Sequence, residues 1–157
     1  MNLKEKIKEE LKNGMREKNE VKVSVMKMLL SSINNKEIEL KQKETGISEE
    51  KMIEAVRAEA KKRRDAAAAY TEAKRDDLAR KEKEENLIIE ALLPEELPLE
   101  EIEKIAKEAV AESKAESIKD FGQAMKVAMQ KIKGRASGDK VGAAIKKALE
   151  NSGCVQC

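Results

Sequence analysis

The chain has 157 residues, 41% of them charged and 1% aromatic, and a formal net charge of +2. This length is sufficient for one or two small domains, and a composition rich in Ala, Glu, Lys and Leu is typical of helical proteins rather than of β-sandwiches or barrels. Because the chain has no histidine, Ser–His and Cys–His nucleophile pairs are excluded, and the scarcity of aromatic residues argues against recognition of single strands by base stacking.

The first part of the sequence predicts a helical domain over residues 1–93, made of about four helices. The second of these helices covers residues 21–33, where eight of thirteen positions are apolar, and continues to about residue 40. A helix apolar on so much of its surface is expected at the centre of a bundle. The first helix is predicted from apolar residues at every fourth position, which are Leu3, Ile7, Leu11 and Met15.

The third and fourth helices are separated from the first two by a break at Thr45 and Gly46. Ser48, with acidic residues directly after it, predicts the N-cap of the third helix. We expect the third helix to reach about residue 70 and the fourth to run from about residue 75 to residue 92.

Two charged clusters lie on these helices, a basic one at residues 61–64 and a mixed one at residues 80–85. We expect the basic cluster to be structural or solvated. The mixed cluster is expected to form a solvent-exposed face of the fourth helix.

Pro94 and Pro98 predict a hinge over residues 94–98, because proline cannot continue a helix and disfavours helical geometry before it. Three shorter helices follow, which predict a C-terminal three-helix domain over residues 99–150. Ser117, three residues before Asp120, resembles a capping box at the start of the second of them.

The last residues, 151–157, are expected to form a flexible tail. They contain Cys154 and Cys157, whose spacing is that of a redox motif or of half a zinc site. No structural element is predicted after them, so we favour an exposed tail. A zinc site completed by another chain is the alternative.

The most informative segment is the basic helix–turn–helix at residues 126–147, which has seven Lys or Arg residues against one acid, Asp139. The preceding residues 95–117 have eight acids and three lysines, so the domain is electrically polar. A basic cluster around a Gly-bracketed turn is the electrostatic footprint of a polyanion-binding surface. The candidate nucleic-acid-binding residues are Lys126, Lys133, Gly134, Arg135, Lys140 and Lys147.

The alternative for this segment is a solvated surface with Gly134 and Gly138 acting only as turn and cap residues. Backbone N–H groups at residues 137–139 could also receive a phosphate. Asp139 opposes this, so we expect side chains to carry any phosphate binding.

Several segments together resemble the YqeY family over nearly the whole chain, to about residue 149. The C-terminal part is also similar to the tail domain of GatB, the tRNA-engaging subunit of an amidotransferase. This resemblance implies an N-terminal helical domain, a three-helix bundle and contact with tRNA. Pro98 stands where a serine is usual and so removes an expected helix cap. The supporting segments are residues 3–7, 12–18, 25–29, 61–65, 93–97, 120–125 and 133–136.

We therefore expect an all-α, cytoplasmic, monomeric accessory protein that binds tRNA and has no catalytic residues, metal, cofactor or membrane span. The first alternative is a helical module that docks on an amidotransferase or an aminoacyl-tRNA synthetase. The second is a component of a carbon–nitrogen ligase, which a family label would suggest. The chain has neither histidine nor a Gly-rich phosphate loop, which argues against that chemistry.

Overall fold

A computed structural model describes residues 1–154, and within this range it has seven α-helices, one 3-10 helix and no strand. The predicted all-α class is therefore confirmed. The chain divides into two compact units, unit 1 (Met1–Leu93) and unit 2 (from Pro94 onward), and each is described by itself.

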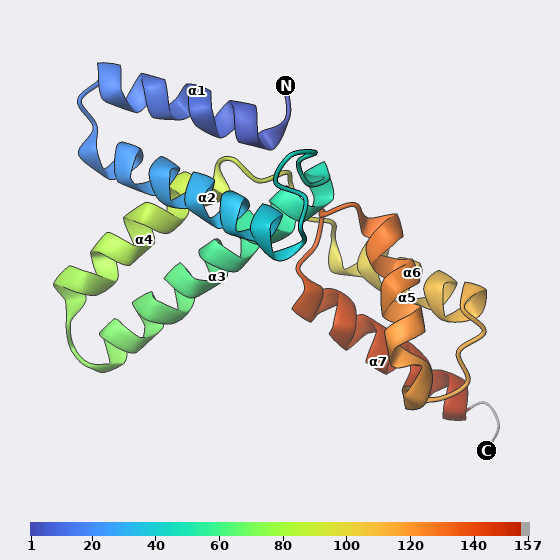
Figure 1. The fold of residues 1–157 in the computed structure, drawn as a ribbon. Helices are drawn as coiled ribbons and strands as arrows, with labels where there is room; N and C mark the ends of the chain where they lie inside the picture. Colours follow the sequence, from blue (N-terminus) through green and yellow to red (C-terminus); the bar gives the residue numbers. More distant parts are fainter. Residues whose placement is uncertain (155–157) are drawn as a thin grey trace. The chain divides into compact units, whose positions relative to one another are not determined.

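Unit 1 has four helices (Figure 1). A short turn joins α1 to α2, and α3 and α4 form a second helical hairpin whose contacts are the most extensive in the unit. Helix α2 contacts all three other helices, as expected of the central helix of a bundle. The helices are α1 (Leu3–Arg16), α2 (Glu20–Glu39), α3 (Glu49–Glu72) and α4 (Asp76–Glu90).

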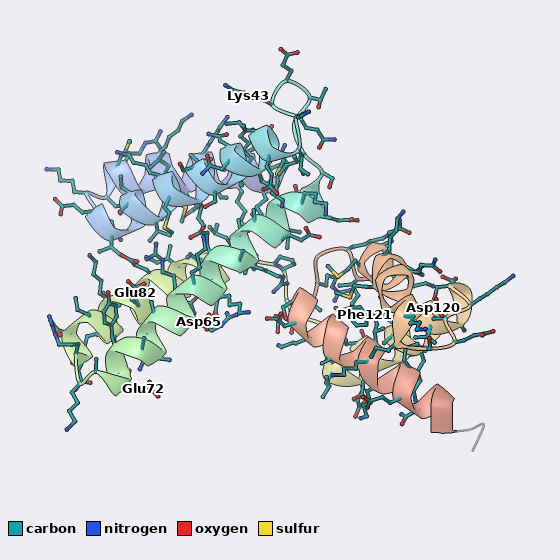
Figure 2. The ribbon with its side chains drawn as sticks, turned by 60° about the horizontal axis from the view of Figure 1, so that its bottom comes forward. Lys43, Asp65, Glu72, Glu82, Asp120 and Phe121 are labelled. Atoms are coloured by element: carbon teal, nitrogen blue, oxygen red, sulfur yellow. The ribbon has the colours of Figure 1, made fainter. Side chains whose placement is uncertain are left out.

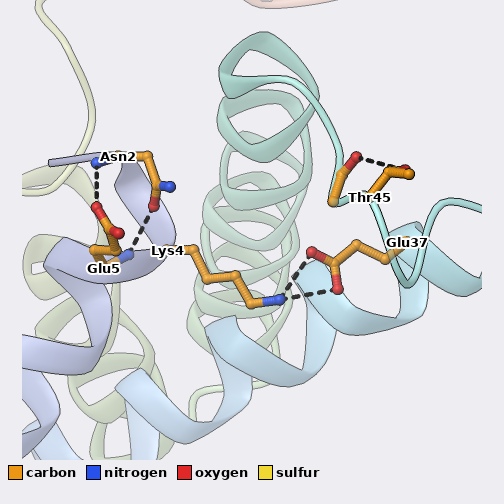
Figure 3. A network of polar contacts seen from close by, with 6 residues as sticks. Asn2, Lys4, Glu5, Glu37 and Thr45 are labelled. Carbon is orange, nitrogen blue, oxygen red and sulfur yellow. Dashed lines mark hydrogen bonds and ion pairs between the residues drawn. The ribbon is translucent and has the colours of Figure 1, made fainter.

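The starts of these helices follow from local capping. The Asn2 side chain accepts a hydrogen bond from the Glu5 N–H, and the Glu5 carboxylate accepts one from the Asn2 N–H, each at 2.9 Å (Figure 3). This capping box satisfies N–H groups that have no partner within the helix. Ser48 accepts from the Lys51 N–H at 3.3 Å, which confirms the predicted N-cap of α3.

Four helices end in the same way, with a lysine in the left-handed conformation. Each lysine N–H donates to the carbonyl three residues earlier, and the next N–H donates to the carbonyl five residues before it, which is the Schellman arrangement. Glycine is usual at this position, because a side chain costs about 1–2 kcal/mol there. The favourable position of an ammonium at a helix C-terminus offsets part of this strain. The lysines are Lys18 (φ 55°), Lys41 (φ 57°), Lys74 (φ 58°) and Lys114 (φ 55°).

The core of unit 1 is built from aliphatic side chains and methionine. It includes four residues of α2, although Val21 at the start of that helix is 37% exposed. Beside these apolar residues, Lys4 of α1 donates to both carboxylate oxygens of the buried Glu37 of α2 at 2.8 and 2.9 Å (Figure 3). The fully buried core side chains are Ile7, Val25, Met26, Leu29, Ile33, Val56 and Ile89.

The mixed cluster at residues 80–85 is not wholly a solvated face. Glu82, which Figure 2 labels on α4, and Glu85 each lie 3.1 Å from Nη1 of Arg63 on α3, and their side chains are 15% and 10% exposed. The expectation of an exposed face is wrong at these two positions. They lie three residues apart and so share the face of α4 that packs against α3.

The basic cluster at residues 61–64 has a structural role at Arg63, which is 22% exposed and also contacts the sulfur of Met28. Lys62 pairs with Glu59 at 3.0 Å and Arg64 with Glu90 at 3.2 Å, both at more exposed positions. Arg63 therefore links three helices of the unit.

Unit 2 is a three-helix bundle with one additional 3-10 turn. Leu97 is 7% exposed and packs in its core, and the Leu97 N–H donates to the Arg135 carbonyl at 2.8 Å. The last residues of the predicted 94–98 hinge are thus attached to unit 2. The elements are α5 (Leu99–Glu112), η1 (Ile118–Asp120), α6 (Phe121–Ile132) and α7 (Gly138–Cys154).

Helix starts in unit 2 also follow the sequence. Ser117 and Asp120 form the expected capping box, and Asp120 lies where η1 leads into α6 (Figure 2). Pro98 occupies the N-cap of α5, which has no side-chain cap hydrogen bond, in agreement with the lost cap. The core has many alanines, which allow close approach of the helices. Its buried residues include Ile102, Ala106, Ala109, Ala124, Ala128, Ile132, Val141, Ile145 and Leu149.

Helix α7 continues to Cys154, and so covers the first four residues of the segment 151–157 that the sequence predicts as a flexible tail. Cys157 lies outside the described residues. Among the helices of the described range, none is sufficiently long and apolar to cross a membrane.

We predict that Arg63→Ala lowers the free energy of unfolding of unit 1 by about 2 kcal/mol or more, because it leaves the carboxylates of Glu82 and Glu85 without their counter-charge in a poorly solvated place. Arg64→Ala is the matched control, and a loss within about 0.5 kcal/mol is expected because its pair is exposed. Urea denaturation of the full chain measures both. Equal losses for the two variants would show that the Arg63 cluster has no special structural role.

Candidate nucleic-acid interface

The turn between α6 and α7 is held by its backbone. Lys133 (φ 53°) and Gly134 (φ 75°) are consecutive left-handed residues, and the Arg135 N–H donates to the Ile132 carbonyl at 3.1 Å. Gly134 is buried, and its positive φ is a conformation that favours glycine. The Lys133 and Arg135 side chains are exposed on either side of this glycine.

Lys126 lies on the outer surface of α6. It precedes Lys133 by seven residues, about two helical turns, so the two residues share one side of the helix. That side is opposite the buried stripe of Ala124, Ala128 and Ile132. Within the described residues, no ion pair involves Lys126, Lys133 or Arg135.

Lys140 and Lys147 lie on a different side, next to α5. Lys140 pairs with Glu96, and Lys147 pairs with Glu103 at 3.3 Å. The two lysines are seven residues apart and so are the two acids, so α5 and α7 run in parallel along this seam. Both lysine side chains remain exposed, at 52% and 65%.

Ion pairs also link α5 to α6. Lys131 of α6 lies 3.2 Å from Glu112 and 3.8 Å from Glu108. Acidic α5 therefore takes one or more ion pairs from each of its neighbours.

The six predicted residues thus fall into two groups. Lys133, Gly134 and Arg135 share the turn, and Lys126 lies two helical turns away on the same side of α6. Lys140 and Lys147 line the seam with α5, where carboxylates already neutralise them. A single positive surface that includes all of them stays a prediction.

Lys146 is a further exposed cation of α7 that was not among the predicted residues. It is exposed and, in the part of the chain that is described, forms no ion pair. It lies one helical turn after Gly142, where an added Cβ would be 3.5 Å from Phe121 of α6. Lys146 therefore lies on the flank of α7 that faces α6. The helical period relative to buried Ile145 and Leu149 could have indicated this.

Asp139 places one negative charge near the turn, in the first turn of α7. An acid here stabilises the helix start and disfavours a phosphate at its N–H groups. Ser137 completes the start by accepting from the Lys140 N–H at 3.4 Å. Side chains rather than the helix terminus are thus the groups available to an anion.

No group of three or more His, Cys, Asp or Glu side chains that could hold a metal ion occurs among the described residues. The charged groups of the turn are cations on a protein surface. Such cations attract anionic oxygens and donate hydrogen bonds to them.

The fold and this surface define a small all-α protein whose second unit presents a basic helix–turn–helix. The family model described as Yqey-like protein matches residues 4–149, and the chain belongs to this family. The chain is also 34% identical over 103 residues to the protein "Altered inheritance of mitochondria protein 41, mitochondrial" of Candida glabrata. That match covers 66% of this chain and 56% of the relative, so it spans little more than half of the relative's length.

Proposed function

We propose that the chain is a non-catalytic accessory protein that binds tRNA through the basic turn of unit 2. The observation that carries the proposal is that Lys126, Lys133 and Arg135 are exposed and outside any ion pair of the described residues. Two such cations at the turn, and a third two helical turns away on the same side of α6, can meet phosphates without first losing a protein partner. Lys146 adds a fourth positive charge on the neighbouring flank of α7.

A structured RNA suits this surface better than a single strand. The aromatic residue of the bundle, Phe121, packs against the core of unit 2, so its ring is not available as a stacking platform. Structured RNA is recognised mainly by shape and by contacts to phosphates and 2′-hydroxyls. Because the sequence of this region resembles the tail domain of GatB, we take tRNA as the preferred ligand within that class.

Lys140 and Lys147 contact the RNA by exchanging their carboxylate partners for phosphates. Exposed ion pairs contribute only about 0–1 kcal/mol, so a phosphate can replace Glu96 or Glu103 as the partner of either lysine. Such an exchange places two carboxylates near the RNA backbone. We therefore expect these lysines to contribute less than Lys133 and Arg135.

The non-catalytic part of the proposal rests on the residues of the chain, which include no histidine to act as a base. It is tested by giving the purified chain mischarged tRNA, ATP and an ammonia donor. Amidated product that persists after any copurifying enzyme is removed would contradict it and favour a carbon–nitrogen ligase component. A cytoplasmic, monomeric state is part of the same proposal, and the relative's name places that protein in mitochondria.

A second candidate function is docking on a protein, such as an amidotransferase or aminoacyl-tRNA synthetase. Two large apolar side chains of unit 2 favour it, since Leu99 is 61% and Ile118 56% exposed. Salt dependence separates the two candidates, because phosphate contacts release counterions and apolar contacts do not.

We predict that the affinity for tRNA falls with salt at a log–log slope of about −4, taking about 0.9 per phosphate contact and four to five contacts. The reversal Lys133→Glu with Arg135→Glu should weaken binding at least about tenfold and flatten this slope, because two attractions become repulsions. Filter binding at several salt concentrations measures both quantities. Folding should be unaffected, since these exposed charges form no ion pair within residues 1–154.

The matched control is Lys41→Glu with Lys43→Glu in unit 1. These residues have the same spacing, both are exposed, and Lys41 shares the left-handed conformation of Lys133. A reversal at residues 62 and 63 would be a poor control because Arg63 is structural. Equal weakening by both double variants, or equal affinity for tRNA and a plain RNA duplex, would favour general charge attraction over a tRNA site.

We also predict that Glu96→Gln with Glu103→Gln strengthens tRNA binding several-fold and steepens the salt slope. The change frees Lys140 and Lys147 and removes two negative charges from the seam. Glu84→Gln with Glu90→Gln in unit 1 is a control of equal charge change. If the unit 2 variant binds no more tightly than the control, Lys140 and Lys147 do not take part.

A further inference from the structure

A separate pocket of about 560 Å³ lies in unit 1 at the corner where α1 leads into α2. Its charged lining consists of Lys18, Glu20 and Lys27, and the Ser24 hydroxyl adds a hydrogen-bonding group. Met15, which is 53% exposed, and Val23 supply an apolar wall. The pocket is open to solvent, since six of its eight lining residues are exposed, which are Met15, Lys18, Asn19, Glu20, Ser24 and Lys27.

The surrounding ion pairs leave this pocket positive. Lys22 lies 2.8 Å from Glu10 and 3.7 Å from Glu17, so it neutralises nearby acids rather than facing a ligand. The hydrogen bond between them lowers the pKa of Glu10 and raises that of Lys22, so both stay charged. Lys18 and Lys27 form no ion pair among the described residues. With Glu20, the pocket lining therefore has a net charge of +1.

The helix ends do not supply this charge. The pocket meets the C-terminus of α1 and the N-terminus of α2, whose partial charges have opposite signs. The positive potential at the pocket thus comes from the two ammonium groups.

Two backbone positions at this corner, Gly14 and Lys18, are also unusual. Gly14 allows close approach of the two helices, because an added Cβ would lie 3.2 Å from Cγ2 of Val23 and 3.3 Å from Cγ of Lys22. Lys18 retains a side chain at a left-handed position where glycine would be less strained. Lys74 shares that strain without lining this pocket, so the pocket and not the strain distinguishes Lys18.

We propose that this corner binds the phosphate group of a nucleotide, with Lys18 and Lys27 on the phosphate oxygens and Met15 and Val23 against the sugar or base. Lysine binds phosphate as a compact point charge. Ser24 donates a hydrogen bond to the same group, and Glu20 limits the affinity by repulsion. This site is independent of the tRNA surface proposed for unit 2.

The test is a titration of the full, ¹⁵N-labelled chain with ATP, monitored through the chemical shifts of its backbone amide signals. Saturable shifts are expected at residues 14–27. Lys18→Gly combined with Lys27→Gln should weaken binding at least about tenfold. Lys18→Gly alone should weaken ATP binding while the midpoint of thermal unfolding stays the same or rises, because glycine suits this conformation. A purely structural lysine would change stability but not binding.

Two matched variants sharpen the result. Lys74→Gly removes the same charge at the same kind of helix end and should leave ATP binding unchanged, whereas Glu20→Gln should strengthen it. The Lys133/Arg135 reversal should also leave it unchanged, so a failure of the tRNA proposal would not affect this one. A 5′-phosphorylated RNA trinucleotide tests whether the phosphate can belong to a strand. If neither ATP nor the trinucleotide shifts residues 14–27, or if Lys74→Gly weakens binding as much as Lys18→Gly, the proposal is overturned.

Discussion

The acidic residues of α5 lie along both seams that this helix shares with its neighbours, and they set the charge that unit 2 presents to solvent. Lys131 and Lys147 are paired with them, and Lys140 is paired with Glu96, which lies just before α5. The remaining cations of the helix–turn–helix lie at the turn and on the side of α6 and α7 away from α5. The anion-binding potential of unit 2 is thus set by which lysines α5 leaves unpaired, and not by the total number of basic residues.

In unit 1 as well, ion pairs decide which cations remain available to a ligand. Arg63, whose side chain is 22% exposed, is held by two carboxylates of α4 and links helices, so it is not available to a ligand. At the α1–α2 corner, Lys22 is paired in the same manner, while Lys18 and Lys27 remain available. In both units the ion pairs therefore stabilise the packing of helices and also determine where unpaired positive charge remains.

Local features could be read from the sequence, because they depend on neighbours along the chain. The helical period, the N-cap at Ser48 and the capping box at Ser117 were all predictable and are confirmed. The ion pairs were not, since Glu96 and Lys140 are 44 residues apart and meet only through packing of α5 on α7. For the same reason the role of Glu85 could not be assigned before the face of its helix was known. The lysines at left-handed helix ends were missed because glycine is the expected residue there.

The measurement that tests the central claim most directly is a map of the tRNA contact on the full, ¹⁵N-labelled chain, obtained from backbone amide shifts during titration with tRNA. The account predicts the largest shifts at Lys126, residues 133–135 and Lys146, with smaller ones at Lys140 and Lys147. A footprint centred on Leu99 and Ile118, or one confined to unit 1, would contradict the claim that the basic turn of unit 2 is the tRNA-binding surface.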